Sequence, residues 1–170
     1  MTGVTQTLTD HFVGLLRRRA EEAGVFGAVE VAGGRVSCRA KASAALAHYR
    51  VECAEGRVWV SLVTKDRWLS QSIEADLVHT GDRLEDLLDE ELVEQGEFAK
   101  ARPARAEPGR ELTVQHFRSE SREFTFRTPV PAEPWGGLST EHAERTARYL
   151  LAYEACFRRL GDMEAGEGDD

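Results

Sequence analysis

Residues 46–64 read LAHYRVECAEGRVWVSLVT and contain two alternating segments on either side of a glycine-containing turn. In residues 46–53, apolar side chains at positions 49, 51 and 53 alternate with polar side chains at positions 48, 50 and 52. In residues 58–64, the valine and leucine side chains at 58, 60 and 62 point one way, and Trp59 and Val63 point the other way. Two period-two segments joined by a short turn predict an antiparallel hairpin.

Two further segments extend this pattern toward the N-terminus. Residues 25–31 contain three valines, and residues 35–42 alternate small apolar side chains with Arg35, Ser37, Arg39 and Lys41. The two glycines of residues 32–34 predict the turn between them. Because sequential strands usually pair with each other, the four segments predict an antiparallel β-meander.

Amphipathic helices are predicted at both ends of the chain. Residues 5–23 place apolar side chains at positions 8, 12, 15, 16 and 20 on one stripe, and Gly24 can supply a left-handed end. Residues 140–160 carry a second stripe that contains Tyr149, Tyr153 and Phe157. The predicted fold class is therefore α+β, with an antiparallel meander sheet packed against the N- and C-terminal helices.

The most acidic stretch, residues 82–97, reads DRLEDLLDEELVEQGE. Eight of its sixteen residues are acidic, yet its leucines recur at helical spacing. This pattern predicts an ordered helix with a negatively charged face opposite the leucines. This helix is inserted between the meander and a second hairpin, which is predicted at residues 111–118 and 123–128. We predict that the leucines and the acids beside them contact a protein partner with a basic surface. The predicted contact residues are Leu84, Glu85, Leu88, Asp89 and Leu92. For the acidic face by itself, a solvated helix held by its leucines is the favoured interpretation, and the docking face is the functional alternative.

Residues 65–79 fit two structures. Leu69, Ile73 and Leu77 lie four residues apart, as in a helix, but they also occupy alternate positions of the kind found in a strand. The missing β-branching at Trp68 and Leu69 and the stop signal of Gly81 favour the helix. Residues 98–110, with two prolines and four basic residues, predict an exposed connection.

Composition predicts one cytoplasmic domain over residues 1–160 and a disordered acidic tail over residues 161–170. The 170-residue chain has a net charge of −8 and no apolar run that could span a membrane. Three cysteines without close spacing predict reduced thiols, not a disulfide or zinc framework. A negative helix face repels phosphate groups, so nucleic acid is not expected as a partner. A minor alternative is that this helix imitates a nucleic-acid backbone.

The chain contains no recognisable reaction centre. Glycine-flanked serine and phosphate-loop motifs are absent from the sequence, and no cofactor is predicted. Asp76 and His79 lie three residues apart on one face of the helix at residues 65–79, which makes them candidate metal ligands, although two solvated side chains are the favoured interpretation. The alternative to partner binding is a small-ligand or metal-binding protein, or an enzyme, with a pocket between sheet and helices. Its candidate lining residues are Tyr49, Arg50, Trp59, Trp68 and Trp135.

The order of elements resembles that of class I type III secretion chaperones and YbjN-like proteins over residues 8–160. That order is a helix, an antiparallel meander, an acidic helix, a hairpin and a long C-terminal helix. The resemblance implies a small, acidic, non-enzymatic protein, usually dimeric, that holds an unfolded or peptide-like partner on its sheet and helix surfaces. The predicted function is therefore protein binding, as an adaptor or chaperone-like homodimer.

Overall fold

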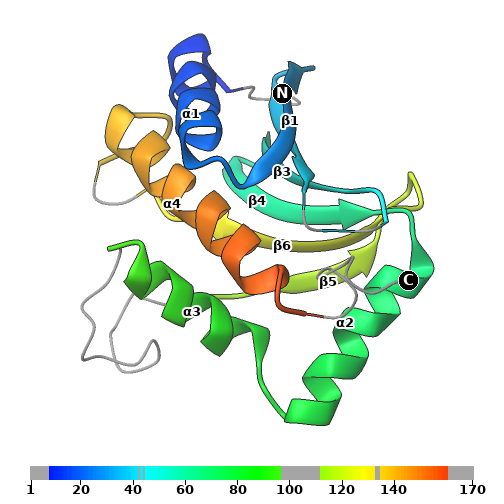
Figure 1. Ribbon diagram of the computed structural model, residues 1–170. Coiled ribbons are helices and arrows are strands. Elements are labelled where there is room, and N and C mark those ends of the chain that lie inside the picture. The colour runs from blue at the N-terminus through cyan, green and yellow to red at the C-terminus, as the bar shows by residue number, and fades with distance from the viewer. Residues whose placement is uncertain (1–7, 42, 44, 97–111, 133–134, 161–170) are drawn as a thin grey trace.

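The computed structural model describes residues 8–41, 43, 45–96, 112–132 and 135–160 (Figure 1). Within these ranges the chain forms six strands and four helices. In chain order they are α1 (Asp10–Ala23), β1 (Phe26–Ala32), β2 (Arg35–Ala40), β3 (Ala47–Ala54), β4 (Arg57–Thr64), α2 (Arg67–Thr80), α3 (Leu84–Glu94), β5 (Gln115–Arg118), β6 (Phe124–Val130) and α4 (Thr140–Phe157). The α+β class and the acidic helix between meander and hairpin are confirmed.

The strands form one antiparallel sheet in the order β1-β2-β3-β4-β6-β5. Strands β1 to β4 are the predicted meander, and the β5–β6 hairpin joins it through β6, which pairs with β4. In the β3–β4 register, Tyr49 lies opposite Leu62 and Val51 lies opposite Val60. Because paired residues share a face of the sheet, this register places the apolar residues of both strands on one side.

All four helices lie on this side of the sheet (Figure 1). Helix α1 packs against β1 and β2, α4 packs against β3, β4 and β6, α3 packs against α4, and α2 contacts β4. A single buried cluster joins the inner face of the sheet to the helices. Its largest members include Phe12, Leu16, Tyr49, Leu62, Ile73, Leu92, Phe126, Tyr149, Tyr153 and Phe157.

Local sequence explains where the terminal helices begin and end. The side chain of Thr9 accepts the backbone N–H of Phe12, and that of Ser139 accepts the N–H of His142, so both α1 and α4 begin with a capping hydrogen bond. Gly24 ends α1 with a φ of 71°, a left-handed conformation that glycine adopts without steric cost. Residues 5–7, predicted as the first part of this helix, lie outside the described residues.

Residues 65–79 are helical, and the strand alternative is wrong. Asp66 caps α2 by accepting the backbone N–H of Leu69 at 2.9 Å, and Gly81 ends the helix with a φ of 78°. Leu69 and Ile73 are buried in the core, as the four-residue spacing predicted. Burial in the core and an N-terminal cap together select the helical conformation of a segment whose periodicity fits both a helix and a strand.

Three predictions fall partly or wholly outside the described residues. These are the basic connection at 98–110, the acidic tail at 161–170 and the first residue of the strand predicted at 111–118, which is observed as Gln115–Arg118. Within the described ranges, none of the helices combines the length and the apolar character needed to cross a membrane.

Candidate functional site

The face of the sheet opposite the helices carries the candidate site. All residues of β4 after Arg57 are buried, although Trp59, Ser61 and Val63 point away from the helices. Trp59 and Val63 are each 3% exposed, yet they do not belong to the core cluster. We use the term open face for the outward residues of β3, β4, β5 and β6. They include Arg50, Trp59, Ser61, Val63, Gln115, Phe117, Thr125 and Arg127, together with His48, Glu52 and Pro129 toward the ends of the strands.

The guanidinium group of Arg127 lies between two aromatic rings of the open face. Its central carbon is 3.8 Å from the ring centroid of Trp59 and 5.1 Å from that of Phe117. Arg127 Nε donates a hydrogen bond to Gln115 Oε1 at 2.8 Å, which holds the guanidinium over the rings. Cation–π contacts of this kind contribute about 0.5–2 kcal/mol each, depending on how well they exclude water. The result is a continuous aromatic and cationic platform across three strands.

A groove begins where this platform ends. Arg50 binds Glu123 through two contacts, Nη1 to Oε1 at 3.3 Å and Nη2 to Oε2 at 3.4 Å. The two side chains are only 14% and 19% exposed, and Arg50 Nε is buried without a hydrogen-bond partner. The pair lines a groove of about 500 Å³ together with Leu46, His48, Lys65 and other residues at the ends of β3 and β4. The groove therefore contains a positive and a negative side chain, Arg50 and Glu123, close to the exposed Leu46.

We expect His48, in this groove, to titrate below 6.5 in an NMR titration of its ring protons. Burial lowers the pKa of His48 most, and the charges of Arg50 and Arg39 lower it further, against opposing effects of Glu30 and Glu123. Since the folded-state pKa lies below the unfolded value, the neutral ring contributes stability at higher pH, and this contribution is lost as pH falls below about 6.5.

The substitution Arg50→Gln is expected to raise this midpoint because it removes a neighbouring positive charge. Arg17→Gln, on the far helix α1, is the matched control and should leave the midpoint unchanged. A midpoint at or above 6.5 in the unsubstituted protein would contradict the assignment.

The residues predicted for partner contact on α3 are mostly used inside the molecule. Leu88 and Leu92 are 1% and 0% exposed in the core, where they hold α3 against α4, and Asp89 is 8% exposed. Leu84 and Glu85 are half-buried. Leu88 and Leu92 are therefore not accessible to a partner in this structure. A leucine stripe shows that a helix packs on something, but not whether that surface belongs to the same chain.

The negative side of α3 is also partly neutralised. Glu91 binds Arg159, which follows α4, at 2.7 Å, and Glu85 binds Arg83 at 3.7 Å. Glu90 and Glu94 remain exposed. The surface that could attract a basic partner is thus narrower than the sequence predicted, and it is centred on these two glutamates.

The candidate metal ligands do not form part of a larger ligand set. Asp76 is half-buried and His79 is exposed near the end of α2. Among the residues that the structure describes, there is no group of three or more His, Cys, Asp or Glu side chains that could hold a metal ion. Glu74 of the same helix instead contacts His116 of β5, whose ring stacks on Phe126.

The five residues predicted to line a pocket between sheet and helices are separated in space. Tyr49 faces the core, with its ring 5.7 Å from that of Phe26, whereas Arg50 and Trp59 lie on the open face. Trp68 is 76% exposed on α2, and Trp135 lies 4.3 Å below the guanidinium of Arg145. Neighbouring residues of a strand point to opposite faces, so Tyr49 and Arg50 cannot line the same side.

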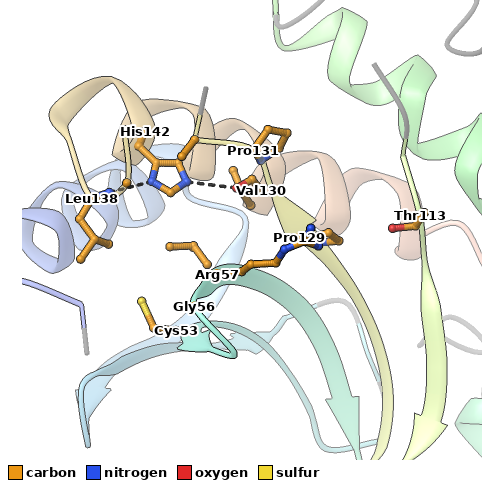
Figure 2. Close-up of a pocket in the computed structure, with 12 residues that line it drawn as sticks. Cys53, Gly56, Arg57, Thr113, Pro129, Val130, Pro131, Leu138 and His142 are labelled. Carbon is orange, nitrogen blue, oxygen red and sulfur yellow. Dashed lines mark hydrogen bonds between the residues drawn. The ribbon is translucent and has the colours of Figure 1, made fainter. Parts of the chain in front are cut away.

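A pocket does exist at one end of the sheet, lined by other residues (Figure 2). It has a volume of about 430 Å³ and lies between the β3–β4 hairpin, the end of β6 and the start of α4. His142 is 2% exposed: its Nδ1 accepts the N–H of Leu138 at 2.9 Å, so Nε2 carries the proton and donates to the carbonyl of Val130 at 3.1 Å. The imidazole therefore serves as a clamp between two backbone segments.

The thiol in this pocket is not activated. Burial and the charge of Glu52 raise the pKa of Cys53, so the protonated form is favoured and the thiol is a poor nucleophile. With His142 held by the backbone on both ring nitrogens, the described lining residues contain no paired nucleophile and base. The pocket is suited to binding, not to nucleophilic catalysis.

Sequence reasoning did not identify Phe117, Glu123 or Arg127 as site residues. Their position beside Trp59 and Arg50 depends on the pairing of β6 with β4, which places Arg127 opposite Ser61. The sequence did contain one indication of this site. Strand β4 has apolar side chains on both of its faces, which is unusual for a strand in a sheet that helices cover on one side only. The chain matches no protein family model, no curated protein and no solved structure.

Proposed function

We propose that this chain is a non-enzymatic protein-binding module, an adaptor or chaperone-like protein, that holds a peptide-like segment of its partner on the open face. The supporting observation is the one-sided arrangement, in which Phe117 and Arg127 lie over or beside the buried Trp59 on the side without described helices. Arginine is enriched among the residues that dominate binding energy at protein interfaces, and Phe117 is 38% exposed. A sheet side that merely faces water usually presents polar side chains in simple alternation.

The groove beside the platform supports recognition of a charged partner. Arg50 and Glu123 are partly shielded from water, so a charged partner side chain that enters the groove can form stronger contacts there than on a fully exposed surface. Glu90 and Glu94 on α3 add long-range attraction for a basic segment. Binding should therefore weaken as salt is added, because ions screen exposed charges over about 10 Å at 0.1 M.

We expect the module to act as a homodimer in the cytoplasm. The cysteines Cys38, Cys53 and Cys156 are free thiols, which is compatible with a reducing compartment. The dimer is an expectation from the resemblance to secretion chaperones and YbjN-like proteins. Sedimentation equilibrium of the purified chain tests it directly, and a monomer mass at micromolar concentration would contradict it.

The double variant Phe117→Ala/Arg127→Ala tests the open face. Immobilised protein is used to capture partners from the native host, and the recovered partner is then titrated against each purified variant. We expect the double variant to bind at least about tenfold more weakly, since arginine is enriched at interface hot spots and phenylalanine is enriched at interfaces in general. Arg17→Ala, an exposed arginine on α1, is the control and should bind normally. Equal affinities for the unsubstituted protein and the double variant would refute the proposal.

A further inference from the structure

The pocket at the end of the sheet has the dimensions and walls of a small-molecule site. Its volume of about 430 Å³ falls within the range of about 300–1,000 Å³ that is typical of ligand pockets. Figure 2 shows Cys53 on the β3–β4 hairpin facing Leu138 and His142, and Arg57 extending from the same hairpin toward Pro129. Its apolar walls are formed by Val58, Pro129, Val130, Pro131 and Leu138.

The charge of this pocket is unbalanced. Among the described lining residues, Arg57 alone carries a full charge and none is acidic. The acids closest to it in the hairpin are engaged elsewhere: Glu52 binds Arg35 at 3.2 Å, and Glu55 binds Arg127 at 3.5 Å. Arg57 itself has no ion-pair partner among the described residues, and its guanidinium carbon lies 6.0 Å from the ring centroid of Trp59. Within the part of the chain that the structure describes, no carboxylate neutralises the guanidinium of Arg57, which belongs to a residue at the border of this cavity.

We propose that this pocket binds a small organic monocarboxylate with an apolar body. The planar guanidinium of Arg57 matches a carboxylate through two parallel hydrogen bonds, and a single positive charge suits a monoanion. The hydroxyl of Thr113, which also lines the pocket, can donate a further hydrogen bond. Burial of an aromatic or branched aliphatic body against Val58 and Leu138 provides the hydrophobic contribution.

The pocket is preformed, because the His142 clamp fixes two of its walls. The ring joins the backbone of Leu138 to that of Val130, and both residues line the cavity. A fixed cavity reduces the entropy that would be lost when a ligand orders its site. Phe117 and Arg127 do not line the pocket, so the open-face variant Phe117→Ala/Arg127→Ala leaves every described lining residue unchanged.

NMR spectra of the amide groups, recorded with 4-phenylbutyrate and a panel of aromatic and branched monocarboxylates, test the site. We expect shifts at Cys53, Leu138 and His142 with the carboxylates, and weak or no shifts with the matched neutral amides. Arg57→Gln should weaken binding by about 10- to 100-fold, the usual effect of losing a charge-assisted hydrogen bond. Arg17→Gln on α1 is the matched control and should bind as the unsubstituted protein does.

A second variant blocks the pocket without altering its charge. Gly137 lines the cavity, and a Cβ atom there would meet nothing within 4 Å, so Gly137→Leu should fold and fill the space. We expect this variant to lose carboxylate binding, while Phe117→Ala/Arg127→Ala retains it. Absence of shifts across the panel at millimolar concentration would overturn the proposal. Equal binding of carboxylates and amides, or equal binding by Arg57→Gln, would also overturn it.

Discussion

Replacing Leu92 by alanine is expected to lower the free energy of unfolding by about 2–5 kcal/mol, the usual range for a fully buried leucine. Leu92 is 0% exposed and belongs to the core cluster that packs α3 against α4. The substitution removes apolar contacts and leaves a cavity, because the two helices cannot close completely around the smaller side chain. Urea denaturation followed by circular dichroism measures the change.

Leu46→Ala is the matched control for this substitution. Leu46 is 59% exposed, so the same chemical change should alter the free energy of unfolding by less than about 0.5 kcal/mol. The comparison separates the two interpretations of the acidic helix. Replacing a leucine that only contacts a partner would change the free energy of unfolding of the isolated protein very little. A decrease below about 1 kcal/mol for Leu92→Ala would therefore contradict its role in the core.

Replacing His142 by alanine should destabilise the protein by about 2–4 kcal/mol, because it leaves one buried and one half-buried backbone group without its partner. The N–H of Leu138 and the carbonyl of Val130 each lose a hydrogen bond to the imidazole. The ring also makes an edge-on contact with Phe12, with 5.6 Å between centroids, which the substitution removes. The clamp therefore connects α1, β6 and the start of α4.

Hydrogen exchange at the Leu138 amide distinguishes this clamp from general packing. The amide should exchange slowly in the unsubstituted protein and much faster in the His142→Ala variant. His11→Ala is the control: His11 Nε2 lies 2.9 Å from Thr140 Oγ1, but this contact is exposed, so its loss should change stability by less than about 1 kcal/mol. Unchanged exchange at Leu138 in His142→Ala would show that another group protects this amide.

Local patterns were sufficient for most of the secondary structure. The alternation in residues 46–64 and the apolar stripes of α1, α3 and α4 depend on neighbours within a few residues, so they can be seen in the sequence. The hairpin β3–β4 followed from its short turn. In residues 65–79 the spacing of apolar residues fits both a helix and a strand, so local pattern alone is not sufficient. The cap by Asp66 and the burial of Ile73 show that the segment is a helix.

The composition of the candidate sites could not be predicted in the same way. Arg50 and Glu123 are 73 residues apart, and Arg127 reaches Trp59 only because β6 inserts beside β4. Leu88 and Leu92, two of the partner contacts predicted on α3, are buried for a related reason. The stripe of Leu88 and Leu92 was correct, but the surface that it covers is the chain's own α4.

By itself, the sequence determined the α+β class, the meander, the acidic helix and the lack of a recognisable reaction motif. Only the tertiary structure decided which strand β6 joins, which side of the sheet the helices cover, and which side chains therefore meet at the open face and at the Arg57 pocket. The physical reason is the range of the interactions. Backbone hydrogen bonding and side-chain periodicity act between near neighbours, whereas the docking of whole elements depends on apolar surface buried between distant segments.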